Sequence, residues 1–558
     1  MNSYNCDFEF QFNYVLSQIP RILSLQDRTP GSKFEGCFHY NYWRDKTQDF
    51  PDSRYQEAAA TLGLVAAAFP QKAGKQKEQL INSFELGLRA WATQQHSDGS
   101  FDEWYKHEHG YASTAFTTFA LGLPFYFNEE FRNKEIFNVY SDTADKSSNW
   151  LENRNDLFKC NHQAVGIGAL AMAGKLLNKK SSLDTADLKL ERLLNCQTEE
   201  GWFPEVGKMD LGYSTLLLDY IMMYEEITGN DAARKKMKIL AKYFTSHIRP
   251  NLTINGKVGL CANPYLGKIG LLLLSKNDPQ SASWIERFRN YSPGFASISP
   301  YLSDDLRLSR WGYLPLLGKI YLEKSITTSL TCEPFENKIT ISDKSGLKSV
   351  YHEDIFYQFS PASGGTIEIF DNKSKRAIFK DHGYLLELDH IKYSTAGYST
   401  SRNYSLSPTE GQVRLVFSEI RGGNPSFILR FILRLGCSIP KMYKPIRALI
   451  DVYRKRKQTA LNQSVSILVQ DSGFLEIERN VKLTKRDVII TDDFVKYPKN
   501  AQDIFNNLSP LLGDEHGEMN IDQNIKRQFI NNKNFQRVVK TISRNTVEQK
   551  PEIKIEFF

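Results

Sequence analysis

The sequence predicts a chain of two parts, an incomplete (α/α) toroid of helical hairpins followed by an antiparallel β-sandwich. In the first part, helix starts recur at intervals of roughly fifty residues, and a repeat of this length is typical of a helical hairpin repeated around an axis. In the second part, short runs of alternating apolar and polar residues are separated by turn residues, a pattern typical of strands. The chain of 558 residues is long enough for two or three domains with large cores.

The domain boundaries follow from changes in this pattern. Residues 1–50 are predicted to be an aromatic entry segment, with loops at 30–32 and 38–43 in place of periodic helix. Residues 51–325 carry the helical periodicity and form the predicted toroid domain. Residues 326–558 form the predicted antiparallel β-sandwich domain.

The toroid is predicted to begin with a helix near Ser53. Ser53 and Gln56 have the spacing of a capping box, and the alanine run that follows them favours helix. Helical periodicity is then clearest at residues 80–95, 113–123, 163–177, 214–228 and 232–247. The helix starts that mark the repeat fall near residues 55, 111, 161, 213, 263 and 312.

A Gln-x-x-Asp/Glu-Gly pattern occurs twice in the toroid, at residues 95–101 and 197–203. It resembles the Gln–Trp repeats of terpene cyclases and other α/α toroids, in which it clamps the outer helices, so we interpret both copies as structural. Tyr111 and Tyr213 follow the two copies at the same spacing. The repeat by itself therefore explains a tyrosine at each position.

The β domain is predicted from six alternating runs. They lie at residues 338–341, 365–370, 412–417, 474–478, 487–491 and 553–557. A basic helical insertion near residues 441–457 interrupts them. We interpret it as an amphipathic helix docked on the sandwich with a solvated basic end, and the alternative is a peripheral contact with an anionic membrane surface.

Composition restricts the class of protein. A net charge of +7 over this length gives no case for nucleic acid, which needs a concentrated basic face. The seven cysteines are widely spaced and include no Cys-x-x-Cys, so neither a disulfide framework nor a structural zinc site is expected. We see no secretory signal at the N-terminus and no apolar run of membrane-spanning length, and we therefore expect a cytoplasmic protein, with a peripheral position at the inner face of the membrane as the alternative.

The helix starts of the repeat are the first candidates for a functional site. The inner helices of such a ring share one direction, so their N-terminal ends lie on one rim, where free N–H groups and the helix dipole favour an anion. Amide, imidazole, guanidinium and phenol groups on this rim suit binding a carboxylate and moving a proton, and not metal binding by themselves. The candidates are Arg54, Tyr111, Asn161, His162, Tyr213, Asn263, Arg310 and Trp311, with Trp104 and Trp202 as sugar-stacking residues.

Several candidates also have a structural interpretation. His162 could be a core or capping histidine, and Arg54 could simply pair with Glu57. Tyr111 and Tyr213 could both pack the ring. For the tryptophans, burial that stabilises the fold is at least as good an explanation as sugar binding.

Asn161-His162 at one inner-helix start, followed by Gly212-Tyr213 at the next, resembles the heparinase II/III-like and alginate-lyase polysaccharide lyases. The resemblance spans the toroid and implies an (α/α) toroid joined to a β-sandwich, acting on a uronate-containing anionic polysaccharide. It further implies that Asn161 neutralises the uronate carboxylate, that His162 assists or serves as base, and that Tyr213 transfers a proton. Either β-elimination or C5 epimerisation would follow from this arrangement, and bacterial surface polysaccharide biosynthesis is the setting we expect.

The sequence departs from this family in the β domain. The family's histidine-containing segment corresponds here to residues 360–370, which have no histidine. His352, Asp381, His382 and His390 lie nearby in sequence, and the second histidine of the mechanism stays unassigned. We expect no cofactor, because the motif does not support a divalent metal in the β domain.

Two other functions stay open. Many α/α toroids are glycoside hydrolases that use two carboxylates across the sugar. A non-catalytic glycan-binding or assembly protein on the same scaffold is the third alternative. The carboxylates near the rim that a hydrolase could use are Asp98, Asp102, Glu103, Glu205, Asp210, Asp304 and Asp305.

Overall fold

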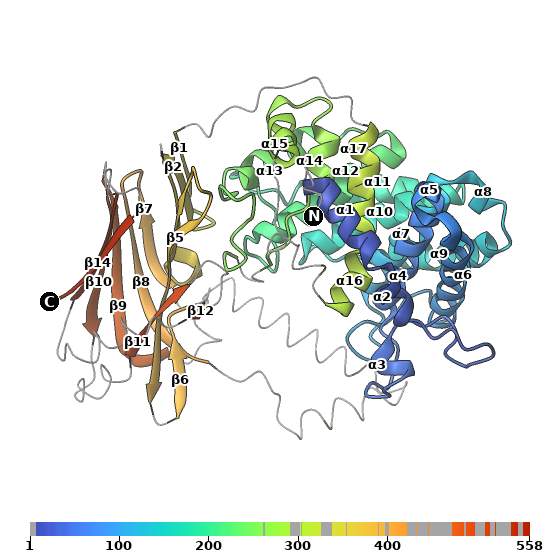
Figure 1. Cartoon of the computed structure of the whole chain (residues 1–558), viewed down its shortest axis with the longest axis horizontal. Helices are drawn as coiled ribbons and strands as arrows, with labels where there is room; N and C mark the ends of the chain where they lie inside the picture. The colour runs from blue at the N-terminus through green and yellow to red at the C-terminus, as the bar shows by residue number, and fades with distance from the viewer. Residues whose placement is uncertain are drawn as a thin grey trace.

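The chain folds into a helical part and a β part that lie side by side, as the computed structural model in Figure 1 shows. The predicted fold class, helical toroid followed by antiparallel β-sandwich, is confirmed. The structure describes residues 7–259, 263–290, 302, 304–324, 337–352, 354–388, 390–396, 401–420, 431, 445, 471–484, 487–496, 508–513, 519–520, 537–544 and 551–558.

An inner ring of helices forms the centre of the helical part. Each inner helix contacts the next, and the last one returns to the first. Nearly all residues of the longer inner helices are buried, because the ring covers one side of each helix and the outer helices cover the other. The inner helices are α4 (Glu57–Ala68), α7 (Tyr111–Phe127), α10 (Cys160–Leu176), α12 (Leu211–Thr228), α14 (Ile269–Leu274) and α17 (Tyr313–Lys324).

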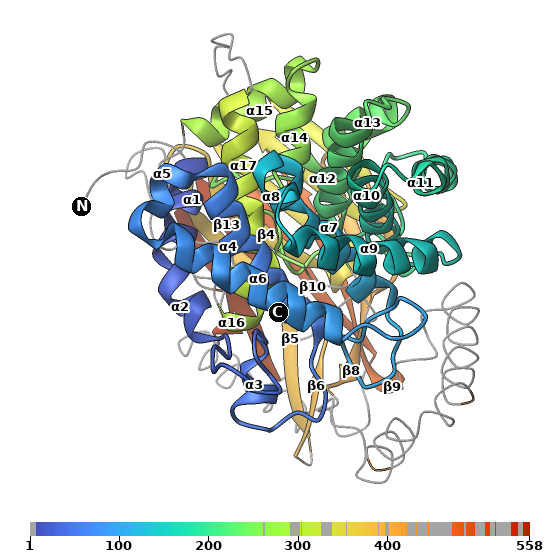
Figure 2. The ribbon, with the colours of Figure 1, turned by 90° about the vertical axis from the view of Figure 1, so that its right-hand side faces the viewer.

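Outer helices cover this ring, and Figure 2 shows them from the side opposite the sheet. They are amphipathic and bury one face. The outer helices are α6 (Lys77–Thr93), α9 (Ile136–Glu152), α11 (Lys180–Leu194), α13 (Arg234–Thr245) and α15 (Pro279–Arg289). The N-terminal helix α1 (Asp7–Ser17) packs on α17 and α15, so the first and last helices of the toroid lie together.

Short helices join these elements. Helix α16 (Asp305–Trp311) leads directly into α17. The others are α2 (Ile19–Ser24), α3 (Tyr40–Trp43), α5 (Pro70–Ala73) and α8 (Glu129–Arg132), with 3₁₀ turns η1 (Ser53–Gln56) and η2 (Gly74–Gln76).

Three local predictions were wrong. Asp52, not Ser53, caps the first helical turn, because its carboxylate accepts the N–H of Arg54 while the Ser53 hydroxyl donates to the Asp102 carbonyl. Part of the expected loop at 38–43 is the single turn α3. Helix α14 begins at Ile269, six residues after the expected start at Asn263 (263 to 269).

The structural role of the repeated glutamine is confirmed. The Gln95 side chain donates to the carbonyls of Gly99 and Thr143 and to the Ser147 hydroxyl, which ties the turn to the outer helix α9. Gln197 makes the matching bonds to Gly201 and to Lys236 of α13. Gly99 has a positive φ of 95°, and a Cβ there would lie 2.2 Å from the Lys146 carbonyl oxygen, so this turn requires glycine.

The β part is one antiparallel sheet folded over on itself. Its strand order is β1-β2-β3-β4-β5-β6-β8-β9-β10-β13-β14, with β11 paired to β5 and β12 and with β7 paired to β8. Apolar side chains of β2–β5 and of β8–β10 and β13 share one core, as in a sandwich. The strands are β1 (Lys338–Ser342), β2 (Leu347–His352), β3 (Ile355–Ser360), β4 (Thr366–Asp371), β5 (Ala377–Leu388), β6 (Ile391–Ser394), β7 (Ser401–Leu406), β8 (Glu410–Glu419), β9 (Asp471–Leu483), β10 (Asp487–Lys496), β11 (Leu508–Gly513), β12 (Met519–Asn520), β13 (Arg537–Arg544) and β14 (Pro551–Phe557).

The other face of β2–β5 docks on the toroid near the end of α13. Arg249 makes a two-pronged ion pair with Glu368 of β4. His247 is hydrogen-bonded to the Ser349 hydroxyl at 2.8 Å, and Tyr351 donates to the Ile248 carbonyl. These contacts fix the β domain against the rim of the toroid.

Two sequence-based expectations concern membranes. Among the helices that the structure describes, none is long and apolar enough to cross a bilayer. The basic insertion at 441–457 lies outside the described residues, apart from Pro445.

Candidate active site at the toroid rim

The starts of α10 and α12 are joined by the loop that precedes α12. The Cys160 N–H donates to the Pro204 carbonyl, and the Val206 N–H donates to the Phe158 carbonyl at 2.8 Å. The loop then reaches Asp210, whose carboxylate caps α12 by accepting the N–H of Tyr213. Asn161-His162 and Tyr213 therefore lie at adjacent helix starts on one rim, as the repeat predicted.

His162 has an orienting partner that the sequence analysis missed. Its Nδ1 lies 2.9 Å from Oδ2 of Asp156, which is in the loop before α10. The imidazole is partly exposed, with 19% of the side chain accessible. A carboxylate bound to one imidazole nitrogen fixes the ring and leaves the other nitrogen for proton transfer.

Asn161 is buried beside Glu205. Its backbone N–H donates to Glu205 Oε2 at 3.4 Å. Among the described residues, neither polar atom of the Asn161 side chain has a hydrogen-bond partner of normal geometry. Buried amides are nearly always satisfied, so an unsatisfied one at a rim indicates a group that a ligand or water completes.

The two tyrosines of the repeat have different environments. The Tyr111 hydroxyl is directed at α10, where a Cβ on Gly166 would lie 2.0 Å from it, and burial raises the pKa of this hydroxyl strongly. Tyr213 is only partly buried, and the residue before it, Gly212, is in close contact with Asn263. Tyr111 is therefore a packing residue, while Tyr213 and Asn263 lie together at the start of α12.

A second group at the rim contains both predicted arginines. Arg54 is paired with Glu57, its Nε lying 2.6 Å from Oε1, and its guanidinium lies over the Phe116 ring. Arg310, at the end of α16, is 2.6 Å from Asp52 and 2.9 Å from Glu103. All of these charged groups are buried, so both arginines are already neutralised by protein carboxylates.

The two arginines lower the pKa of Asp52, Glu57 and Glu103 to different extents, and only at Glu103 does this attraction outweigh the effect of burial. Burial outweighs the attraction of Arg310 at Asp52 and raises its pKa to about 6. Burial likewise raises the pKa of Glu57 to about 7 against the effect of Arg54. At Glu103 burial is overcome by Arg310 and Arg54, with help from His162 and Lys159, and the pKa is lowered. Glu103 thus joins the arginine group electrostatically to the start of α10.

The predicted tryptophans are placed differently from one another. Trp104 is 70% exposed beside Arg310 and offers an open indole face at the rim. Trp202 is buried, and its N–H donates to Glu200, which also accepts backbone N–H groups of Lys344 and Ser345 in the β domain. Trp202 therefore helps to join the two domains.

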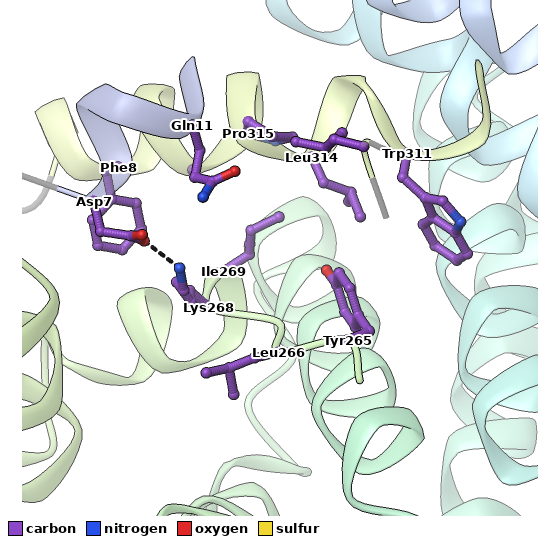
Figure 3. Close-up of a pocket in the computed structure, with 12 residues that line it drawn as sticks. Asp7, Phe8, Gln11, Tyr265, Leu266, Lys268, Ile269, Trp311, Leu314 and Pro315 are labelled. Carbon is purple, nitrogen blue, oxygen red and sulfur yellow. Dashed lines mark hydrogen bonds and ion pairs between the residues drawn. The ribbon is translucent and has the colours of Figure 1, made fainter. Parts of the chain in front are cut away.

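Trp311 lies at one end of a narrow cavity of about 80 Å³ between α1, α17 and the segment before α14 (Figure 3). Its ring stacks on Tyr265, with centroids 5.8 Å apart. The other end of the cavity is closed by the ion pair between Asp7 and Lys268. The cavity is lined mainly by apolar side chains, which suits an apolar group better than a sugar.

Lys159 is a further rim residue that the sequence analysis missed. It occupies the N-cap position of α10, where the helix dipole disfavours a cation. No carboxylate in the described part of the chain forms an ion pair with it, although it lowers the pKa of both Glu103 and Glu205. A cation at a helix start that no described carboxylate binds directly is a natural partner for an anionic ligand.

Asp381 and His382 do not form a joint metal site. Asp381 and His382 are successive residues of β5 and point to opposite faces of the sheet. Asp381 lies in the sandwich core, bound to Arg479 and Lys540, whereas His382 lies in the interface with the toroid. Burial, with Lys257 nearby, lowers the pKa of His382 to about 4. In the described residues, no group of three or more potential ligands could hold a metal.

The fold is similar to those of solved polysaccharide lyases. A Paenibacillus xanthan lyase aligns with a TM-score of 0.52 and 9% identity over 88% of this chain and 46% of that chain. The Streptomyces coelicolor A3 chondroitin AC lyase in complex with chondroitin sulphate aligns with a TM-score of 0.55 and 8% identity over 87% of this chain and 66% of that chain.

The present chain thus spans about half of the first lyase and just under two thirds of the second. At such low identity the similarity shows the fold alone. No family model matches the sequence, and no curated protein sequence is similar to it.

Proposed function

We propose that this protein is a polysaccharide lyase-like enzyme that acts on a uronate-containing anionic polysaccharide. The observation that carries the proposal is the Asp156–His162 pair beside Asn161 at the start of α10, next to Tyr213 at the start of α12. The similarity of the fold to solved polysaccharide lyases supports the substrate class.

The proposed reaction begins at the proton next to the uronate carboxylate. That proton becomes acidic only when the carboxylate is neutralised, so that an enolate-like intermediate can form. The buried amide of Asn161 and the cation of Lys159, which forms no ion pair within the described residues, supply this neutralisation. Arg54 and Arg310 do not, because Glu57, Asp52 and Glu103 already bind them.

His162 is the base in this proposal. Asp156 holds its Nδ1, so Nε2 can accept the C5 proton. Tyr213 protonates the leaving glycosidic oxygen in β-elimination, or returns a proton to the opposite face of C5 in epimerisation. The exposed ring of Trp104 stacks on a neighbouring sugar.

The rim carboxylates do not favour a glycoside hydrolase. A hydrolase needs two carboxyl groups facing each other across the sugar. Here each candidate already binds a protein group: Asp98 to Ser100 and His109, Asp102 to the His107 and His109 N–H groups, Glu103 to Arg310, Glu205 to Asn161, Asp210 to Tyr213, Asp304 to Arg307 and Asp305 to Arg21.

Product analysis tests the proposal. The protein is incubated with a panel of uronate polymers while near-ultraviolet absorbance is followed, because elimination creates an unsaturated uronate. Absorbance that rises with wild type and not with His162→Ala supports the proposal. Cleavage without this absorbance indicates hydrolysis, and binding that is unaffected in Asn161→Ala, His162→Ala and Tyr213→Phe, without turnover, indicates a glycan-binding protein.

A further inference from the structure

Glu205 is a buried carboxyl group that forms no ion pair within the described part of the chain. It lies in the loop between α11 and α12 and is only 3% exposed. Within the described residues no lysine or arginine forms an ion pair with it, and its carboxyl group accepts a long hydrogen bond from the Asn161 N–H at 3.4 Å. A carboxylate removed from water without a paired cation favours its neutral, protonated form.

The side-chain amide of Asn161 could form a hydrogen bond with a protonated Glu205. Its Nδ2 and Oδ1 are both buried, and in the described structure neither has a partner of normal hydrogen-bond geometry. The Asn161 side chain is nevertheless close enough to Glu205 to stabilise its charged form. A protonated carboxyl carries an O–H donor, which a small rotation would direct at Asn161 Oδ1, whereas an ionised carboxylate can only accept from Nδ2.

We propose that Glu205 is a positioning residue that, when protonated, donates to Oδ1 of Asn161 and leaves the amide N–H₂ group free for the substrate, and that binds this N–H₂ group itself when it ionises. A carboxylate can only accept hydrogen bonds, so ionised Glu205 draws the amide N–H₂ group toward itself. That N–H₂ group is the one that the substrate carboxylate needs. The inference deepens the proposed function, because it makes the carboxylate-binding amide dependent on pH.

The groups around Glu205 set the pH at which this change occurs. Burial is the main cause and raises the pKa of Glu205 to about 8. Asn161 and Lys159, at the start of α10, oppose this rise, whereas Asp210 before α12 adds to it. The Cys160 thiol also faces Glu205, and burial raises the pKa of that thiol strongly, so it stays neutral. Glu205 is therefore protonated at neutral pH and ionises in mildly alkaline solution.

The test follows the Asn161 amide directly and needs no substrate. Protein labelled with ¹⁵N-asparagine is titrated from well below to well above pH 8, and the Asn161 side-chain resonance is assigned by its loss in Asn161→Ala. We expect the wild-type resonance to shift with a midpoint near pH 8. In Glu205→Gln, which keeps both a donor and an acceptor, the shift should be absent, while Glu199→Gln, an exposed change in the same loop, should titrate as wild type.

A wild-type resonance that does not move through this range, or an unchanged shift in Glu205→Gln, would overturn the inference. Circular dichroism confirms that the variants are folded, and Glu205→Asp provides a second, shorter acid whose midpoint should move. On any uronate polymer that is turned over, kcat/KM should fall above pH 8 in wild type and not in Glu205→Gln. Because the titration needs no turnover, the inference can stand or fail separately from the proposed function.

Discussion

His162 is the residue on which the proposed chemistry depends most, and its partner Asp156 defines its role. An imidazole held by a carboxylate through one nitrogen is oriented for proton transfer through the other. The sequence pointed to His162 through the repeat. It could not point to Asp156, which lies in a loop without any pattern and is brought to the ring by the chain turning into α10.

Removing the orienting carboxylate should reduce turnover without unfolding the protein. We expect Asp156→Asn to lower kcat by about 10²-fold, since positioned general bases contribute about 10²- to 10⁴-fold. Asp145→Asn is the matched control, because Asp145 lies on the outer helix α9 and forms an ion pair at the surface with Lys179. Equal kcat values for Asp156→Asn and Asp145→Asn would show that the pair has no catalytic role.

Phenylalanine substitutions of Tyr111 and Tyr213 should distinguish a packing role from a catalytic role. The Tyr111 hydroxyl is buried and has no hydrogen-bond partner among the described residues, so Tyr111→Phe should leave the free energy of unfolding unchanged or raise it. Tyr213→Phe should instead abolish proton transfer with little effect on stability. Thermal unfolding and activity assays of both variants check this, and a Tyr213→Phe enzyme of wild-type activity would remove Tyr213 from the mechanism.

At the scale of elements, the glutamine clamps connect each turn of the repeat to the next outer helix. Gln95 makes three hydrogen bonds that join the Gly99 turn to α9, and Gln197 repeats the arrangement at α13. The repeat made this role predictable. The packing of α1 on α17 was not, because nothing local relates the two ends of the toroid, and residues 1–50 lack the repeat.

Loss of a clamp should destabilise the toroid. Gln95→Ala leaves the Gly99 and Thr143 carbonyls without this donor, and we expect it to cost about 1–3 kcal/mol of unfolding free energy. Gln71→Ala is an exposed control of the same chemistry and should be neutral. Denaturant unfolding measures both, and equal midpoints would contradict the clamp.

At the scale of the whole molecule, the core of the β domain contains a cluster of four buried charged side chains that the sequence pattern does not reveal. Arg479 and Lys540 pair with Asp381 and Asp492 inside the sandwich core, and all four side chains are fully buried. Strands β9 and β10 follow each other, but β5 and β13 lie far from them in sequence. Each charge therefore appears in the sequence only as an exception in an alternating run.

Breaking this group should unfold the β domain easily. Lys540→Met leaves two buried carboxylates with one cation, and removing one partner of a buried network costs about 3–5 kcal/mol. Lys482→Met, an exposed change on β9, is the control. If both variants unfold at the same denaturant concentration, the buried charges contribute nothing measurable.

Buried histidines and buried carboxyl groups should make the stability of the chain fall both as pH falls below about 4.5 and as pH rises from about 6.5 toward 8. Burial lowers the pKa of His39 and His382 to about 4, so the unfolded state binds more protons below the usual histidine pKa of about 6.5 and stability falls as pH falls. Burial raises the pKa of Glu57 to about 7 and of Glu205 to about 8, so the folded state holds more protons and stability falls as pH rises toward 8. Thermal unfolding across this range checks the profile, and a steady rise in stability up to pH 8 would contradict it.

The most direct test of the proposed activity is the fate of the C5 proton of the uronate. Wild type and His162→Ala are incubated with uronate polymers in D₂O, and the sugars are analysed by mass spectrometry. We predict unsaturated uronate, or deuterium at C5, with wild type and neither with His162→Ala. Saturated products without deuterium at C5, or the same products from both proteins, would contradict proton abstraction by the rim of α10 and α12.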